Sequence, residues 1–314
     1  MENLLARKSA GDRRKRFDRK RLLINIPLFV MFTPIIVYFL VFKYIPMLGL
    51  VVAFKDYNFT EGIWGSPWVG LDHFKLLFSN PNMQNILRNT FILSLLQIVV
   101  GFPFPILTAL LIHEARKLWF KKTVQTAVFL PHFLNWVIVG QIVITIFSQQ
   151  TGIVNTVVEA LFGEPYAFLY HEGSWISIFV GAGIWKGAGW GAIIYLAALA
   201  AIDTSLYEAA SMDGAGKWRH IWHISLPSLV PTIVIQLILT IGGVMEVGFD
   251  QVYVLQNSVV SSISEVISTW SYKSGINGGQ FSLATALGLF ESLIGLTLVL
   301  LTNWIARRYN QGLW

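Results

Sequence analysis

Six long apolar runs constrain this chain more than any other feature of its sequence. An α-helix rises 1.5 Å per residue, so about 20 apolar residues cross about 30 Å of lipid hydrocarbon. The chain is 54% hydrophobic and 13% charged, whereas soluble domains carry about 25% charged residues. The sequence therefore predicts an all-α membrane protein whose six transmembrane helices lie roughly at 22–42, 86–112, 124–147, 175–202, 226–249 and 281–305.

Basic residues predict the orientation of these helices. Four segments on one side of the predicted membrane hold 17 of the 23 Lys and Arg residues, namely 1–21, 113–123, 203–225 and 306–314. Cytoplasmic loops are enriched in Lys and Arg, so we expect these segments and both termini in the cytoplasm. The basic tail 1–21 could also contact nucleic acid, but a tail directly before an apolar run is typical of an anchor on anionic lipid.

The remaining sequence divides without a soluble domain. The run 22–42 is too long for a signal peptide and is predicted to be an uncleaved helix. Segment 43–85 is expected outside, with the short patch Ile45–Phe54 lying at the membrane interface or on the bundle. Segment 86–305 is the expected core domain of five helices, and 306–314 is a cytoplasmic tail. Glycines four residues apart predict close helix packing in the fourth helix, at Gly183, Gly187 and Gly191.

The cytoplasmic loop 203–227 has a strong local pattern. Ser205 followed three residues later by Glu208 is typical of a capping box, which predicts that a short helix begins there. Asp213-Gly214 ends that helix, because glycine tolerates backbone angles that other residues avoid.

A second short helix is predicted after Gly214. Trp218, Ile221 and Trp222 recur at helical spacing and form one apolar face. Leu226-Pro227 then starts the next long helix, where the missing proline N–H costs little. An amphipathic loop resting on lipid headgroups would show the same periodicity, so periodicity alone leaves both interpretations open.

The residues of this loop resemble a known family. The pattern Glu-Ala-Ala-x-x-Asp-Gly-Ala, then Ile-x-Leu-Pro, is similar to the EAA loop of permease subunits of binding-protein-dependent ABC importers. Segments 49–57, 185–190, 248–253 and 312–314 also look like the branch that takes up oligosaccharides and polysaccharides. The matching residues of the loop are Glu208, Ala209, Ala210, Asp213, Gly214, Ala215, Ile224, Leu226 and Pro227.

The resemblance implies a type I ABC importer permease fold and a set of partners. These are a second permease, expected to be a different chain, two ATPase subunits, an extracytoplasmic solute-binding protein and an oligosaccharide or polysaccharide substrate in a bacterial cytoplasmic membrane. Glu208 would contact a basic ATPase residue, and Trp218, Ile221 and Trp222 would fill a socket on the ATPase. No phosphate-binding Gly-x-x-x-x-Gly-Lys-Ser/Thr occurs in the chain, so ATP and Mg²⁺ are expected on the partner subunits.

Charged residues inside predicted spans are candidates for the substrate path, because an unpaired charge at mid-depth costs about 2.5–3.5 kcal/mol or more. Lys186 and Glu291 are both expected near the midplane, where they would pair with each other, line a polar path, or do both. Sugars bind to aromatic faces and to planar hydrogen-bonding groups. The full set of path candidates is Asn135, Trp136, Gln141, Trp185, Lys186, Trp190, Glu246, Asp250, Gln251 and Glu291, many of which are also suited to helix packing.

Other function classes have less support. A secondary transporter, or a membrane assembly subunit without transport, would leave the EAA pattern unexplained or put it to another use. A membrane enzyme would need a catalytic constellation, but the chain has no Cys and its His residues lack the spacing of a metal site. Lys186 and Lys273 favour an acidic saccharide of the alginate or pectin type, although two lysines are little evidence.

Overall fold

The computed structural model describes residues 25–115 and 117–308. These residues are mostly helical, with one isolated antiparallel bridge between Lys55 and Trp68. The whole predicted basic tail 1–21, the start of the predicted first helix at 22–24, Arg116 and the terminal residues 309–314 lie outside the described part.

Five helices of the described chain are long and apolar enough to cross a membrane, and a bent pair makes a sixth span. The bent pair joins Leu118–Phe133 to Trp136–Ile146 at an angle of 104°. The prediction of six spans is therefore confirmed, but the prediction of one continuous helix over 124–147 is wrong. The five long helices are Ile26–Phe54, Pro81–His113, Glu172–Ala200, Lys217–Gly242 and Phe281–Arg308.

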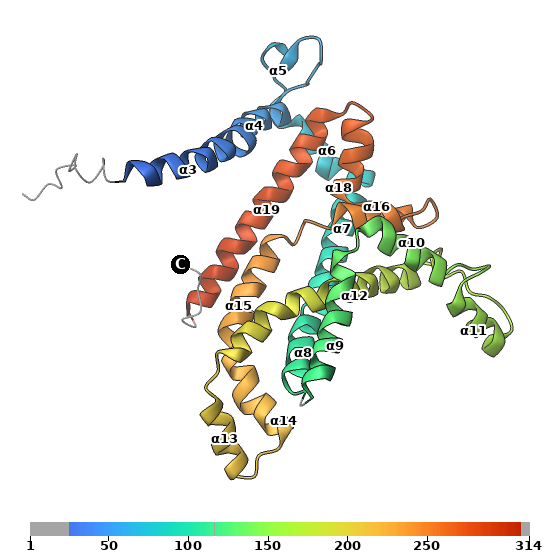
Figure 1. Ribbon diagram of the computed structural model, residues 1–314. Coiled ribbons are helices and arrows are strands. Elements are labelled where there is room, and N and C mark those ends of the chain that lie inside the picture. The colour runs from blue at the N-terminus through green and yellow to red at the C-terminus, as the bar shows by residue number, and fades with distance from the viewer. Residues whose placement is uncertain (1–24, 116, 309–314) are drawn as a thin grey trace, which may run out of the picture.

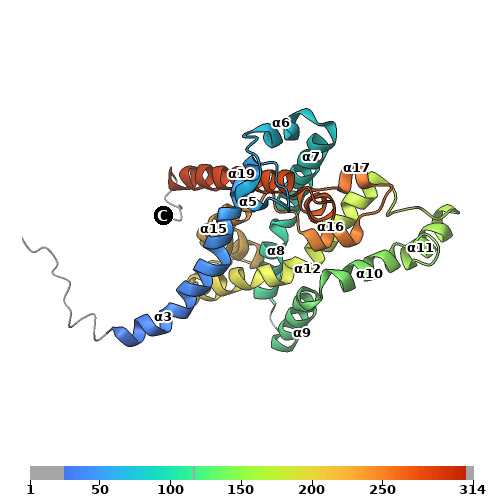
Figure 2. The same cartoon turned by 90° about the horizontal axis from the view of Figure 1, so that it is seen from above.

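The first of these helices leaves the bundle. It consists of α3 (Ile26–Phe39), η1 (Leu40–Tyr44), α4 (Ile45–Met47) and η2 (Leu48–Phe54), and α3 projects away from the other helices (Figures 1 and 2). Its side chains are exposed as far as Leu48, whereas Val52 and Ala53 are buried where η2 packs against α19 (Phe281–Arg308). The patch Ile45–Phe54 thus packs on the bundle, but it continues the first helix instead of forming a separate interfacial helix.

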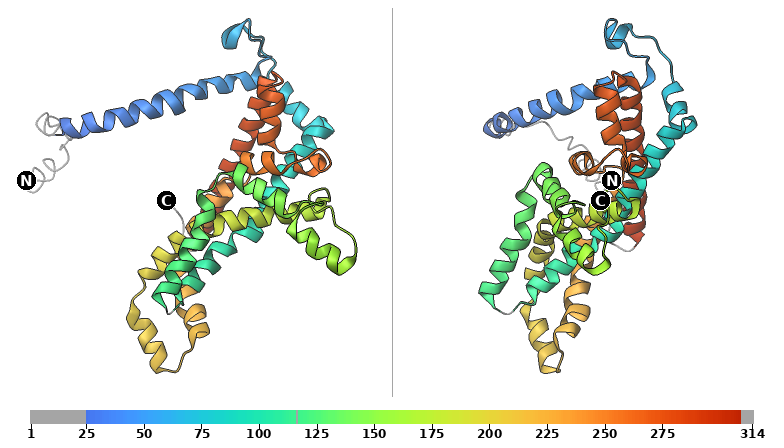
Figure 3. Two further views of the ribbon diagram at one scale, coloured as in Figure 1. Left: turned by 45° about the vertical axis from the view of Figure 1, so that its right-hand side comes forward. Right: turned by 90° about the vertical axis from the view of Figure 1, so that its right-hand side faces the viewer.

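Short helices gather at the end of the bundle from which α7 (Pro81–Leu96) and α19 start. They are α5 (Gly62–Gly65), α6 (Asp72–Ser79), α16 (Phe249–Leu255), α17 (Ser261–Ser264), α18 (Ile267–Trp270) and η6 (Ser271–Ile276). Helix α11 (Ile153–Phe162) projects sideways beyond α10 (Trp136–Ile146) (Figure 3).

The second span accommodates its prolines through a wider helical turn. It runs through α7 (Pro81–Leu96), the π-helical turn η3 (Gln97–Gly101) and α8 (Pro103–His113). A proline ring clashes with the carbonyl group four residues earlier, and a π-helical turn before Pro103 provides the extra room.

Helix α12 (Glu172–Ala200) is the central element. It packs against α8, α9 (Leu118–Phe129), α10 and α15 (Leu226–Gly242). Trp175 and Phe179 stack in its buried part, with ring centroids 5.2 Å apart. At Gly189 an added Cβ would collide with the carbonyl oxygen of Val128, so glycine lets α9 approach closely. Gly189 does not belong to the predicted stripe of Gly183, Gly187 and Gly191. At Gly187, within that stripe, an added Cβ would have no neighbour within 4 Å.

We expect Gly189→Ala to destabilise the subunit by about 1–3 kcal/mol, because the added methyl group must push α9 away from α12. Gly187→Ala is the matched control and should be neutral or slightly stabilising, since its Cβ meets open space. Thermal unfolding of both variants in the same detergent checks this expectation. Equal midpoints for the two variants would contradict the packing role of Gly189.

Candidate functional site

A helical arm extends beyond the membrane-spanning helices at one end of the molecule. It consists of α13 (Thr204–Met212), the turn around Gly214, and α14 (Lys217–His220), which continues through the π-helical turn η5 (Ile221–Ser225) into α15. Figure 1 shows α13 and α14 at the end opposite α5 and α6. The residues from Lys217 to Gly242 form one helix of 26 residues. The predicted helix–glycine–helix shape is thus present, and its second limb is the start of a spanning helix.

The N-terminal cap of the arm differs from the prediction. Asp203 is the N-cap of α13, and its carboxylate accepts a hydrogen bond of 2.9 Å from the backbone N–H of Ser205. Ser205 lies inside the helix, so the predicted Ser205–Glu208 capping box is wrong. Glu208 is exposed on the outer face of α13. The Asp203 carboxylate also interacts favourably with the positive end of the helix dipole.

Gly214 ends α13 as predicted. Its φ is +77°, in the left-handed region that favours glycine. The N–H of Ala215 donates to the carbonyl oxygen of Ala210, and the N–H of Gly214 donates to that of Ser211, at 2.9 and 3.0 Å. These two bonds form a Schellman motif, which satisfies carbonyl groups at the helix end. Asp213 is the C-cap residue of the same helix.

Polar and aromatic contacts brace the two limbs of the arm. The Tyr207 hydroxyl and the buried Ser225 hydroxyl lie 2.9 Å apart. The Tyr207 ring packs against His220 from the second limb and against His113 from the end of α8. Lys217 Nζ donates to the carbonyl oxygen of Glu114 at 2.9 Å. Tyr207 and Ser225 carry no signal in the sequence, because they are 18 residues apart and meet only where the arm folds back at Gly214.

The apolar face of the second limb divides between the protein and solvent. Trp218 and Trp222 are 73% and 61% exposed, and Met212 at the tip of α13 is 89% exposed. Ile221 is partly buried and packs against the cluster of α8, α12 and α15 side chains around Leu229. Two exposed tryptophans on a braced arm form an apolar surface suited to a protein partner. Among the other residues of the matched pattern, Ala209 and Pro227 are exposed. The partly buried ones are Ala210, Ala215, Ile224 and Leu226.

A second cluster lies at the break in the third span. Lys186 Nζ, from the middle of α12, donates to the carbonyl oxygens of His132 and Leu134 at 2.8 and 2.6 Å. The same Nζ atom lies 5.7 Å from the centroid of the Trp136 ring. His132 also stacks on the half-exposed Trp190, with ring centroids 4.3 Å apart. The helix break therefore gathers Lys186, Trp136 and Trp190 in one place.

The Lys186–Glu291 ion pair is not formed. Within the described part of the chain, the ion pairs are Lys75–Asp72 and Lys273–Glu265. The carboxylate that affects Glu291 electrostatically is that of Glu246, which has the same charge and cannot form an ion pair with it. Glu246 belongs to the turn after α15, which ends at Gly242, seven residues short of the end of the predicted run 226–249.

The other path candidates are dispersed. Asn135 caps α10 by accepting a hydrogen bond from the N–H of Ile138, and Gln141 and Asp250 are exposed on α10 and α16. Gln251 is buried, where its side-chain amide donates to the carbonyl oxygen of Phe179 and its oxygen accepts from Gln97. Gln251 therefore ties α16 to η3 and α12 inside the bundle.

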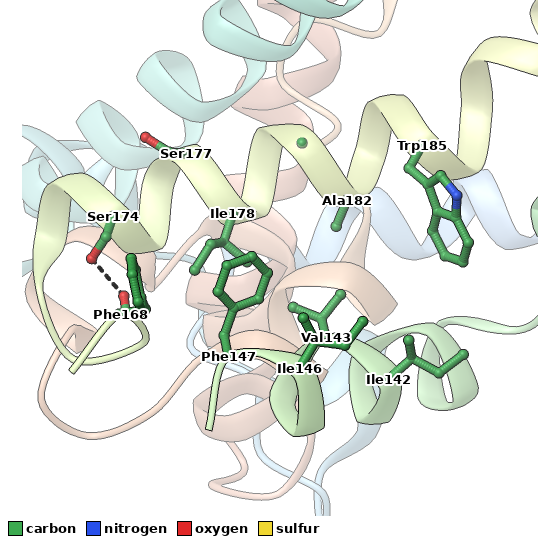
Figure 4. A pocket seen from close by; sticks show the side chains of 11 residues that line it. Ile142, Val143, Ile146, Phe147, Phe168, Ser174, Ser177, Ile178, Ala182 and Trp185 are labelled. Atoms are coloured by element: carbon green, nitrogen blue, oxygen red, sulfur yellow. Dashed lines mark hydrogen bonds between the residues drawn. The ribbon is translucent and has the colours of Figure 1, made fainter. Parts of the chain in front are cut away.

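Trp185 lines an apolar cavity of about 670 Å³ between α10 and α12. Figure 4 shows Ile142, Val143 and Ile146 of α10 opposite Ile178 and Ala182 of α12, with Trp185 at one end. Two serines of α12, Ser174 and Ser177, are its polar side chains, and Ser174 already donates to the carbonyl oxygen of Phe168 at 2.6 Å. The cavity offers a sugar few hydrogen-bonding partners.

Comparisons with known proteins identify the family. A model of the binding-protein-dependent transport system inner membrane component matches residues 78–314. The chain belongs to this family. The family resemblance seen in residues 208–227 is thereby confirmed.

Similar proteins cover most of the chain. The chain is 44% identical to the polygalacturonan/rhamnogalacturonan transport system permease protein YteP of Bacillus subtilis (strain 168), over 95% of this chain and 94% of that protein. It is also 44% identical to protein LplB of the same organism, over 90% of this chain and 89% of LplB. A crystal structure of a bacterial ABC transporter involved in the import of the acidic polysaccharide alginate has a chain with 39% identity and a TM-score of 0.85, over 92% of this chain and 98% of that chain.

Asp203 makes the order of the arm sensitive to pH. The hydrogen bond from the Ser205 N–H lowers the pKa of the Asp203 carboxyl below its ordinary value. A lowered folded-state pKa gives a stabilising contribution that is present above the ordinary Asp pKa and is lost as the pH falls through the lowered value. We expect Asp203→Ala to speed amide hydrogen exchange across Thr204–Met212 at neutral pH. Asp203→Asn keeps an acceptor oxygen, so the protection factors of these amides should stay close to those of the wild type and should not change as the pH falls. Equal protection in all three proteins would contradict the cap.

Lys186 stabilises the broken span, because its ammonium group satisfies two carbonyl groups that have left the helical pattern. We expect Lys186→Met to destabilise the subunit by about 2 kcal/mol or more, since hydrogen bonds to a charged group contribute about 1.5–3 kcal/mol. The control is Lys75→Met, whose exposed pair with Asp72 should contribute less than about 1 kcal/mol. Thermal unfolding in detergent compares the two, and an unchanged midpoint for Lys186→Met would contradict this role.

Proposed function

We propose that this chain is one of two pore-forming permease subunits of an ATP-driven importer that carries oligosaccharides or polysaccharides across the bacterial cytoplasmic membrane. The observation that carries the proposal is the braced arm with its exposed Trp218 and Trp222. Because the arm continues as one helix into the span Lys217–Gly242, a force on the arm moves the membrane domain directly. The excess of basic residues in both terminal segments and in the arm supports a cytoplasmic location for all three.

The partner at the arm is an ATPase subunit. The chain contains no phosphate-binding loop, so the energy for transport must come from another subunit. Glu208 is exposed on α13 and is available to a basic residue of that subunit, while the two tryptophans are available to an apolar socket. Ile221 was expected to fill the same socket as the two tryptophans. It packs inward instead, where it links the second limb of the arm to the bundle.

A second permease is proposed as the partner of the first helix. Residues 26–48 expose an apolar surface all round. Lipid covers such a surface equally well, but the projecting geometry also lets the helix pack on a neighbouring membrane subunit. The pore then forms between two permeases, with two ATPase subunits on one side and a solute-binding protein on the other. A solved alginate transporter that contains a chain 38% identical to this one, with a TM-score of 0.86, is in complex with an alginate pentasaccharide-bound periplasmic protein.

An acidic saccharide is the substrate that the relatives support best. The names of YteP and of the alginate transporter refer to polymers of acidic sugars. The lysines of this chain add little to that choice, because Lys186 binds two backbone carbonyl groups and Lys273 pairs with Glu265. Within this proposal, the half-exposed Trp190 of the Lys186 cluster and the half-exposed Trp185, which precedes Lys186 in α12, are the first candidates for contact with the passing sugar.

We expect Gly214→Val to leave the subunit in the membrane but to uncouple ATP hydrolysis from uptake. A β-branched residue is strained at a φ of +77°, so the turn that places the second limb should be distorted. Gly216→Val is the matched control, because Gly216 has a φ of −85° and open space around an added Cβ. The measurements are co-purification of the ATPase subunit, ATP hydrolysis stimulated by the solute-binding protein, and uptake of labelled trigalacturonate.

The outcomes separate the proposal from other functions. Uptake that requires the ATPase subunit and fails in Gly214→Val supports an importer coupled through the arm. Normal uptake by Gly214→Val would remove the coupling role of the arm. A wild-type chain that binds no ATPase subunit, or that transports without one, would favour a secondary transporter.

A further inference from the structure

A polar cavity of about 520 Å³ lies at the end of the bundle opposite the arm. Its walls come from the first turns of α7, from α17, α18 and η6, and from the loop before α19. The cavity is separate in sequence and in space from the Lys186 cluster. In contrast to the apolar cavity beside Trp185, its lining consists mainly of amide, hydroxyl and charged side chains.

Asparagines form a stripe along one wall. Asn82, Asn85 and Asn89 are spaced three and four residues apart, so they share one face of α7. The buried Asn89 supports the cavity, because its Nδ2 donates to the carbonyl oxygens of Ser262 and Glu265 at 2.8 and 3.1 Å. Asn82, Asn85 and, across the opening, Gln280 are exposed. Within the described part of the chain their side-chain amides have no hydrogen-bonding partner, so the fold leaves them free.

The charges of the cavity balance. Lys273 Nζ binds Glu265 Oε2 at 2.9 Å, and the two side chains are 43% and 21% exposed. The second carboxylate oxygen of Glu265 is buried and has no partner among the described residues. The lysine keeps two further N–H groups that can donate. The cavity therefore presents donors and acceptors together without a net charge, and the Trp270 side chain contributes an aromatic wall.

We propose that this cavity binds one or two sugar rings of an oligosaccharide. A sugar ring carries several hydroxyl groups that each donate and accept, and side-chain amides match this need with one donor group and one acceptor each. The apolar face of a sugar ring also suits an aromatic side chain. A cation is a poorer match, because no group of three or more His, Cys, Asp or Glu side chains is gathered anywhere in the described chain. The choice of a saccharide as the ligand class rests on the proposed function.

The site would hold substrate at the outer end of the permease, ahead of the membrane path. In the proposed orientation, the arm is cytoplasmic and the cavity faces the side on which a solute-binding protein delivers its ligand. A weak site at this point would keep a released oligosaccharide from diffusing away. Loss of the site should then raise the KM for uptake without changing the maximal rate.

The test measures direct binding to the complete importer in lipid nanodiscs, without its solute-binding protein. The probe is chosen beforehand from trigalacturonate, an alginate trisaccharide and arabinotriose, by uptake into proteoliposomes that contain the wild-type importer together with its solute-binding protein. Binding of that trisaccharide is then measured by saturation-transfer NMR for the wild type, Asn85→Ala, and the double variant Asn82→Ala with Gln280→Ala. Asn277→Ala is the matched control, because Asn277 is exposed and lies outside the cavity lining.

We expect each cavity variant to weaken binding by about tenfold, in line with the loss of one or two hydrogen bonds, and the control to bind as the wild type does. A wild type that imports the probe but does not bind it directly, or variants that bind it normally, would overturn the site and leave the proposed function standing. Variants that lose affinity for the solute-binding protein alone would also overturn it, because the cavity would then be a protein-docking surface. A wild type that neither imports nor binds any of the three sugars would remove the proposed function and the site together.

Discussion

Two hydrogen bonds from Lys186 Nζ make the bend in the third span possible. Within a bilayer, backbone carbonyl groups that leave a helix have no water to bind, and each unsatisfied group costs several kcal/mol. The carbonyl groups of His132 and Leu134 are in this position, and the ammonium group of Lys186 satisfies both. The rest of the central bundle follows from this arrangement. Helix α9 can turn away from α10 by 104°, pack against Gly189 of α12 and leave Trp190 stacked on His132.

The features that could be predicted from the sequence are those that depend on neighbouring residues in the chain. Helix number and the Gly214 turn follow from local properties, namely run length and the special backbone freedom of glycine, while the orientation given by the basic residues stays a prediction. The break in the third span had local signals as well, since Pro131 and Asn135 lie within the apolar run. A count of apolar residues does not register them, because the flanking residues are strongly apolar on both sides.

Other features depend on contacts that a linear reading does not contain. Estimated depth suggested an ion pair between Lys186 and Glu291, but a lysine can bind backbone oxygens as well as a carboxylate. The N-cap of α13 is a similar case, because Asp203 and Ser205 are both good caps and the chain direction after α12 decides between them. The regular spacing of Gly183, Gly187 and Gly191 does not indicate Gly189, because the tightest contact depends on which face of α12 the helix α9 approaches. The substrate path remains a prediction, because the proposed second permease would supply its other wall.

In the proposed importer, the long helix that begins in the arm acts as a mechanical lever. Its 26 residues span about 39 Å at 1.5 Å per residue, so a tilt of about 10° at the arm displaces the far end by about 7 Å. At that far end an added Cβ on Gly295 of α19 would lie 2.7 Å from the Gly242 carbonyl oxygen, so the stroke is delivered to the last spanning helix at a point with almost no slack. The π-helical turn at Ile221–Ser225 is an irregular joint along this helix, and the Tyr207–Ser225 hydrogen bond fixes that joint. Pro231 lies farther along the same helix, inside α15. The stiffness of the helix at these two places therefore sets how much of the proposed movement at the arm reaches the opposite side of the membrane.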